Sequence, residues 1–116
     1  CGPCVTEFPE LVTIHRMYRH RPFELVTVSA NFPDQKDEVL QFLKKQQASC
    51  RNLLFAGTDK YKQMSAFDPA WDATIPYTVL INPQGEIIYK TTGAIDPLEV
   101  KRAIVKVLGT YKEPKK

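Results

Sequence analysis

The sequence predicts an α/β domain. Segments with apolar residues every three or four positions alternate with short β-branched runs, and this alternation is typical of a sheet covered by helices on both faces. The last two apolar runs are joined only by Asn82-Pro83-Gln84-Gly85, so they must form an antiparallel hairpin. The length of 116 residues, with 43% apolar and 25% charged residues, fits one globular domain.

The first half of the chain predicts two helices and two strands. A helix is expected over 4–18, kinked by the internal Pro9. A strand is expected over 23–29, whose β-branched residues suit a buried parallel position. An amphipathic helix over 34–47 and a short strand over 52–55 follow.

The second half adds a short helix over 59–67 and the strands of the hairpin, 77–81 and 86–91. A last helix is expected over 96–108, with Gly109 at its end. The hairpin and this helix give the predicted sheet one mixed edge.

Composition and charge exclude several classes. The net charge is only +3, and the one basic cluster is the short tail Lys112, Lys115 and Lys116, so nucleic-acid binding is not indicated. No apolar run approaches 18 residues, so no membrane span is expected. Three cysteines are too few for a disulfide-rich scaffold.

The start of the chain is unusual because Cys1 follows no initiator Met and no signal peptide. A helix that begins at a Cys-x-x-Cys motif normally follows a strand. We therefore expect that sequence upstream of Cys1, including the first strand or strands, is missing. The expected domain covers 1–109 and is followed by a basic flexible tail over 110–116.

Cys1-Gly2-Pro3-Cys4 is the motif that carries chemistry. Thiol–disulfide exchange needs a thiolate that attacks a disulfide and a second thiol that resolves the mixed disulfide. Two intervening residues place both sulfurs on one helical turn, where unpaired N–H groups and the helix dipole stabilise a thiolate. Such motifs lower the first thiol's pKa from ~8.5. We assign Cys1 as the nucleophile and Cys4 as the resolving thiol.

Two other interpretations of these cysteines compete with this one. They could form a structural disulfide or be inert thiols. Cys1, Cys4, His15 and His20 also have nearly a zinc-finger spacing. A helix over 4–18 argues against zinc, because it separates His15 from Cys4 by roughly 16 Å along the axis.

The motif followed five residues later by Pro9 resembles the thioredoxin superfamily. Thr74-Ile75-Pro76 resembles the cis-proline loop of that superfamily, and Gly93 resembles the glycine beside its substrate groove. The run Cys4-Val5-Thr6-Glu7-Phe8-Pro9 is similar to the TlpA/ResA-like branch, whose members are exported and often membrane-anchored. The resemblance covers roughly 1–108.

This resemblance implies a thioredoxin-like three-layer α/β/α fold with a mixed sheet. Two features depart from the superfamily. Its first strands, and the Trp that usually precedes the motif, are absent from this chain. Thr74 stands where thioredoxins usually have Gly.

The resemblance also implies roles for residues around the motif. Pro76 is expected to follow a cis bond and to leave the backbone of Ile75 free to pair with an extended substrate. Glu7, three residues after Cys4, could take the proton from Cys4, or could be a solvated acid without a catalytic part. The expected substrate-binding residues are Gly2, Pro3, Thr74, Ile75, Pro76 and Gly93.

Trp71 and Cys50 have open roles. Trp71 could wall the groove and exclude water from the sulfurs, or could simply pack its own loop. Cys50 is interpreted as a small buried hydrophobic residue, with a peroxidatic or metal role as the minority view.

The expected function is therefore that of a cofactor-independent thiol:disulfide oxidoreductase that reduces exported proteins and contributes to cell redox homeostasis. Its expected partners are disulfide-containing proteins and a membrane or soluble thiol electron donor. Family resemblance implies an extracytoplasmic, periplasmic or membrane-anchored location. The alternative is an adaptor that binds partners near Pro76 without turnover.

Overall fold

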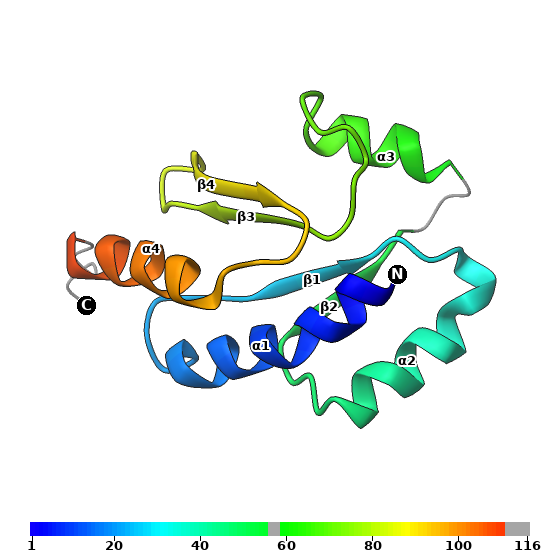
Figure 1. Cartoon of the computed structure of the whole chain (residues 1–116), viewed down its shortest axis with the longest axis horizontal. Helices are drawn as coiled ribbons and strands as arrows, with labels where there is room; N and C mark the ends of the chain where they lie inside the picture. Colours follow the sequence, from blue (N-terminus) through cyan, green and yellow to red (C-terminus); the bar gives the residue numbers. More distant parts are fainter. Residues whose placement is uncertain (56–58, 111–116) are drawn as a thin grey trace. The chain divides into compact units, whose positions relative to one another are not determined.

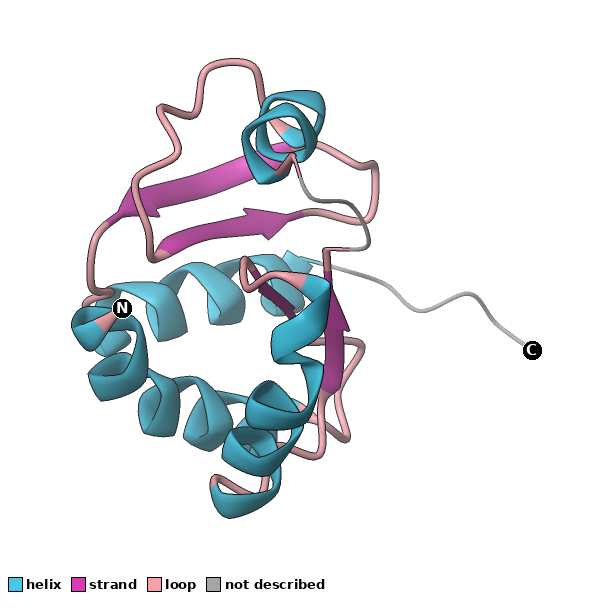
Figure 2. Ribbon diagram, turned by 90° about the vertical axis from the view of Figure 1, so that its right-hand side faces the viewer, coloured by secondary structure: helices cyan, strands magenta, loops and turns pink. Residues whose placement is uncertain are grey.

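The structure is a computed structural model that describes residues 1–55 and 59–110 (Figure 1). The chain divides into two compact units. One unit consists of Cys1–Phe23 and Thr74–Lys116, and the other is Glu24–Ala73. In the described part of the chain, strands occur as two pairs, β1 with β2 and β3 with β4 (Figure 2).

The first unit contains two long helices and a hairpin. Its helices are α1 (Gly2–Tyr18) and α4 (Pro97–Thr110), and its strands are β3 (Tyr77–Ile81) and β4 (Ile87–Thr92). The strands pair antiparallel, with a register irregularity between Leu80 and Ile81. The predicted hairpin is confirmed.

Asn82 and Gly85 form the turn of this hairpin. The Asn82 side chain accepts hydrogen bonds from the backbone N–H groups of Gln84 and Glu86, at 3.1 and 2.9 Å. Gly85 has a φ of 84°, a left-handed conformation that glycine adopts without a side-chain clash. This turn chemistry explains why the five residues from Asn82 to Glu86 suffice to join the strands.

The core of the first unit joins α1 to α4. Its buried residues come from α1, from α4 and from the segment before α4, and they are Ile14, Ile95, Val100 and Ile104. Half-buried side chains from all four elements and from the segment after α1 pack against them, namely Leu11, Tyr18, Phe23, Leu80, Tyr89 and Leu108. Burial of this apolar surface fixes the two helices against the hairpin.

The second unit is built on a parallel strand pair. β1 (Val26–Ser29) and β2 (Arg51–Leu54) run parallel with Val26 opposite Arg51. Between them the chain forms a short 3-10 helix, η1 (Pro33–Gln35), and then α2 (Lys36–Lys45), which supplies the crossover that parallel strands need. The last helix of this unit is α3 (Lys60–Phe67).

Several predicted boundaries were wrong. The first strand begins at Val26 rather than at 23, because the backbone of Phe23 still closes a turn onto Arg21. The second helix is a 3-10 turn followed by α2, and the chain leaves it through Gln47 at a φ of 54°. α1 begins at Gly2, and Pro9 does not end it.

Gly109 was also wrongly placed as a helix stop. α4 continues through it to Thr110, because Gly109 does not adopt the positive φ with which a glycine ends a helix. Thr110 therefore belongs to α4, and the rest of the predicted tail lies outside the described residues. No helix in the described ranges is long and apolar enough to cross a membrane.

Candidate active site

Cys1 and Cys4 are joined by a disulfide at the start of α1. The sulfur atoms are 2.03 Å apart and the Cα atoms 5.3 Å apart. Cys1 caps the helix, and its Sγ accepts a hydrogen bond from the backbone N–H of Cys4 at 3.3 Å. Cys1 is exposed whereas Cys4 is half-buried, so the Cys1 sulfur is the one that an incoming partner meets.

The helix terminus gives Cys1 a favourable electrostatic environment. The first N–H groups of a helix have no partner within the helix, and the helix dipole is positive at this end. Gly2 and Pro3 occupy the first turn, which contains no acidic residue. A thiolate formed at Cys1 on reduction would therefore be stabilised and not repelled.

The loop before β3 approaches Cys1. The Ile75–Pro76 peptide bond is cis, as expected. The carbonyl oxygen of Ile75 lies 3.9 Å from the Cys1 Sγ, which carries no proton in the disulfide, so this is a contact rather than a hydrogen bond. The Ile75 side chain is 39% exposed beside this contact.

Gly93 lies against the same loop. Its backbone N–H donates a hydrogen bond to the carbonyl oxygen of Pro76 at 2.8 Å. Its φ is 84°, and the space around its Cα is open. The structure thus brings together Cys1, Ile75, Pro76 and Gly93, which are far apart in the sequence.

Glu7 is buried on α1, with 6% of its surface exposed. Its Oε1 accepts a hydrogen bond from the backbone N–H of Ile95 at 2.8 Å. Burial raises the pKa of Glu7 above its ordinary value of 4.5, and the hydrogen bond from Ile95 opposes part of that rise. Glu7 follows Cys4 by three residues, a spacing that places both on one side of the helix. The expectation of a solvated side chain is therefore wrong, and the catalytic part of Glu7 stays a prediction.

Three candidates remain, namely Thr74, Cys50 and Trp71. Thr74 is exposed next to Ile75. Cys50 and Trp71 belong to the Glu24–Ala73 unit, and their roles stay predictions. The Cys50 thiol donates to Asn52 Oδ1 at 3.5 Å, and burial raises the pKa of the thiol.

The positions of the candidate zinc ligands on α1 argue against a shared zinc site. α1 is continuous from Gly2 to Tyr18, so His15 lies eleven residues, or roughly 16 Å, beyond Cys4 along the helix. Over residues 1–55 and 59–110, no three His, Cys, Asp or Glu side chains form a group that could hold a metal ion.

Comparison with known proteins identifies relatives in sequence. No protein-family model matches the chain. The thiol-disulfide oxidoreductase ResA of Bacillus subtilis is 30% identical over 95 residues, which cover 82% of this chain and 49% of ResA. ResA of Halalkalibacterium halodurans is 27% identical over 95 residues, with the same coverage. The chain spans about half the length of these curated relatives.

Solved structures resemble the chain in fold. A Chlorobium tepidum protein assigned as thiol:disulfide interchange protein DsbE matches with a TM-score of 0.74 and 22% identity, covering 94% of this chain and 73% of that one. StoA from Bacillus subtilis matches with a TM-score of 0.66 and 25% identity, covering 88% and 72%. These similarities confirm the predicted thioredoxin-like α/β fold.

Proposed function

We propose that this chain, which has a thioredoxin-like fold, is a thiol:disulfide oxidoreductase of the TlpA/ResA type that works through Cys1 and Cys4. The observation that carries the proposal is the disulfide between an exposed and a half-buried cysteine at the start of a helix. This pair supplies an accessible attacking sulfur and an adjacent resolving sulfur.

The proposed reaction starts from the reduced pair. The Cys1 thiolate attacks one sulfur of a client disulfide, which forms a mixed disulfide and releases the other client sulfur as a thiolate. The Cys4 thiolate then attacks the Cys1 sulfur, which forms the Cys1–Cys4 bond and releases the second client thiol. Two electrons pass to the client, and a thiol donor must return two electrons to the domain.

The client is proposed to lie along the Thr74–Pro76 loop. Ile75 presents its carbonyl oxygen beside the Cys1 sulfur, so an extended client segment that pairs with this backbone would bring its own sulfur to Cys1. Gly2 and Pro3 on the helix side, and Gly93 behind Pro76, have no bulky or charged side chain that would obstruct such a segment.

Glu7 is proposed to accept the proton of Cys4 during resolution, either directly or through water. A carboxyl group with a raised pKa is better matched to a thiol, which lowers the cost of proton transfer between them. We expect Glu7→Gln to slow the second step while the protein stays folded, whereas Glu10→Gln, which changes an exposed acid on the same helix, should not. Equal turnover of the wild type and Glu7→Gln at every pH would remove this role.

The wider setting is also part of the proposal. The clients would be disulfide-containing exported proteins, and a membrane or soluble thiol donor would re-reduce the pair. The location would be extracytoplasmic, and residues 1–109 would act as one domain. Support comes from the similarity to ResA, which is named a thiol-disulfide oxidoreductase.

Reduction of insulin by dithiothreitol tests the activity. The wild-type chain should accelerate it, Cys1→Ser should abolish the acceleration, and Cys50→Ser should retain it. If the wild type gives no acceleration, the proposed enzyme activity is wrong. If the wild type gives no acceleration but still binds a client peptide, the alternative of an adaptor without turnover is correct.

A further inference from the structure

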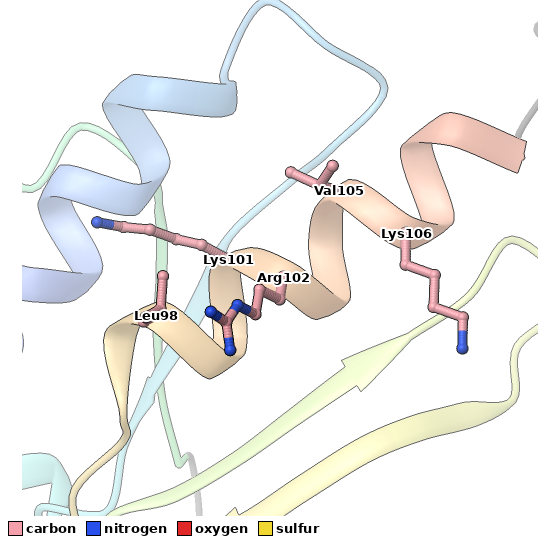
Figure 3. Close-up of a pocket in the computed structure, with 5 residues that line it drawn as sticks. All are labelled: Leu98, Lys101, Arg102, Val105 and Lys106. Carbon is pink, nitrogen blue, oxygen red and sulfur yellow. The ribbon is translucent and has the colours of Figure 1, made fainter.

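The outer face of α4 carries a hollow that plays no part in the proposed reaction. The hollow has a volume of about 430 Å³. Figure 3 shows five side chains that line it. Among residues 1–55 and 59–110, those that line it all come from α4, and they are Leu98, Lys101, Arg102, Val105 and Lys106. Their spacings of three and four residues place them on one side of the helix, which we call the α4 outer face.

The apolar residues of this face do not belong to the buried core of the unit. α4 contributes Val100 and Ile104 to the core of its unit, and both are buried. Leu98 and Val105 lie on the α4 outer face, each 55% exposed. Two large apolar side chains, two turns apart on one helix, are therefore left in contact with solvent.

The α4 outer face is also positively charged. Lys101, Arg102 and Lys106 line the hollow together with the two apolar residues, and no acidic side chain of the described residues lines it. Glu99, the one acid within α4, shares a hydrogen bond with Tyr89 of β4. Burial makes the largest contribution to the raised pKa of Tyr89, and the negative charges of Glu99 and Asp96 raise the pKa further. This effect is expected when the Glu99 side chain points toward β4.

We propose that the α4 outer face is a docking surface for an acidic segment of a partner protein. Carboxylates of the segment would pair with Lys101 and Arg102, and an apolar side chain would pack in the shallow hollow between Leu98 and Val105. Charge complementarity selects an acidic partner.

The docking surface shares no residue with the disulfide site. Cys1, Cys4 and the Thr74–Pro76 loop contribute nothing to the hollow, so an occupant of the α4 outer face would not need to contact the sulfurs. Binding can therefore be measured independently of oxidoreductase activity.

A synthetic acidic peptide provides the test. The probe is a 14-residue helical peptide with Glu at successive three- and four-residue spacings around one central Leu, labelled for fluorescence anisotropy. We expect saturable binding in 50 mM salt that weakens as salt rises. Reversing two charges with Lys101→Glu and Arg102→Glu should weaken binding about tenfold. Leu98→Ser with Val105→Ser should weaken it several-fold, and a peptide with Lys in place of Glu should not bind.

The matched control reverses two exposed adjacent cations on another helix. Lys44→Glu with Lys45→Glu in α2 changes the net charge equally and should change affinity by less than about twofold. Each variant should keep the wild-type circular dichroism spectrum and insulin reduction. Absence of saturable binding, or an equal loss in the α2 control, would overturn the proposal.

Two further outcomes would also overturn it. Vesicles of phosphatidylserine and phosphatidylcholine could bind the chain through Leu98 and Val105 while the peptide does not, which would identify a lipid surface as the occupant. Sedimentation could instead show self-association that Lys101→Glu with Arg102→Glu abolishes, which would identify a second copy of the chain.

Discussion

Glu7 and Ile95 are joined by a buried hydrogen bond that spans 88 residues of sequence, with the Glu7 carboxylate accepting from the Ile95 backbone N–H at 2.8 Å. Ile95 is part of the core, and Glu7 lies one helical turn after Cys4. The same carboxyl group therefore ties α1 to the segment before α4 and lies on the side of α1 that carries the resolving cysteine.

The first prediction concerns the effect of Glu7 on stability as pH changes. Burial raises the folded-state pKa above 4.5, so the folded protein binds this proton more tightly than the unfolded chain. At pH values below 4.5 the Glu7 carboxyl is protonated in both the folded and the unfolded state, so its ionisation does not change the free energy of unfolding. As pH rises through and above 4.5, the unfolded chain ionises first, and the free energy of unfolding falls until the folded carboxyl has also ionised.

Glu7→Gln removes this pH dependence while keeping an oxygen that can accept from Ile95. Urea unfolding at a series of pH values between 4 and 8 should show the wild type losing stability relative to Glu7→Gln as pH rises. Glu10→Gln, on the exposed side of the helix, is the control. A wild type that gains stability over Glu7→Gln with rising pH would contradict the assignment.

The second prediction concerns the core between α1 and α4. Ile104 is 2% exposed in the buried cluster, whereas its neighbour Val105 is 55% exposed on the outer face. Ile104→Ala should lower the free energy of unfolding by about 2–5 kcal/mol through lost burial and the cavity left behind. Val105→Ala should change it by less than about 0.5 kcal/mol. Equal effects in urea unfolding would mean that this cluster does not stabilise the fold.

The third prediction contrasts two glycines. Gly93 has a φ of 84°, so Gly93→Ala should cost about 1–2 kcal/mol of stability although the space around it is open. Gly109 lies inside α4 without a positive φ, so Gly109→Ala should stabilise the helix by up to about 1 kcal/mol. Thermal unfolding followed by circular dichroism would compare them, and a stabilising Gly93→Ala would contradict the conformation of this loop.

The fourth prediction concerns Cys50. Burial raises the pKa of this thiol, so it holds less thiolate at neutral pH than an ordinary cysteine. In the reduced chain, iodoacetamide at pH 7 should modify Cys1 before Cys50, as read by peptide mass spectrometry. Modification of Cys50 ahead of Cys1 would point instead to the minority view of Cys50 as a reactive thiol.

Local sequence patterns predicted the elements and the disulfide motif, because these depend on residues close in sequence. The spacing of Cys1 and Cys4 and the turn from Asn82 to Gly85 are of this kind. The cis-proline loop was expected only through family resemblance, and its contact with Cys1 through Ile75 was not predicted, since no local pattern encodes it. The partner of Glu7 was not predicted, because Ile95 contributes only a backbone N–H, which every residue except proline possesses.

The hollow on α4 was also missed, for a different reason. Periodicity predicts that Val100, Ile104, Val107 and Leu108 face the core. The core cluster contains Val100 and Ile104, and Leu108 packs against it. The positions of Leu98 and Val105 outside that stripe became informative only when their exposure was known. Boundary errors such as the one at Gly109 have the same origin, because composition does not reveal which φ a glycine adopts.

The central claim is that Cys1 attacks client disulfides and Cys4 resolves the product. Its most direct test is to incubate reduced Cys4→Ser with a disulfide-containing peptide and to identify the product by mass spectrometry. The account predicts a stable mixed disulfide between the peptide and Cys1, and none with Cys1→Ser under the same conditions. An adduct that forms on Cys50, or no adduct with Cys4→Ser at all, would contradict it.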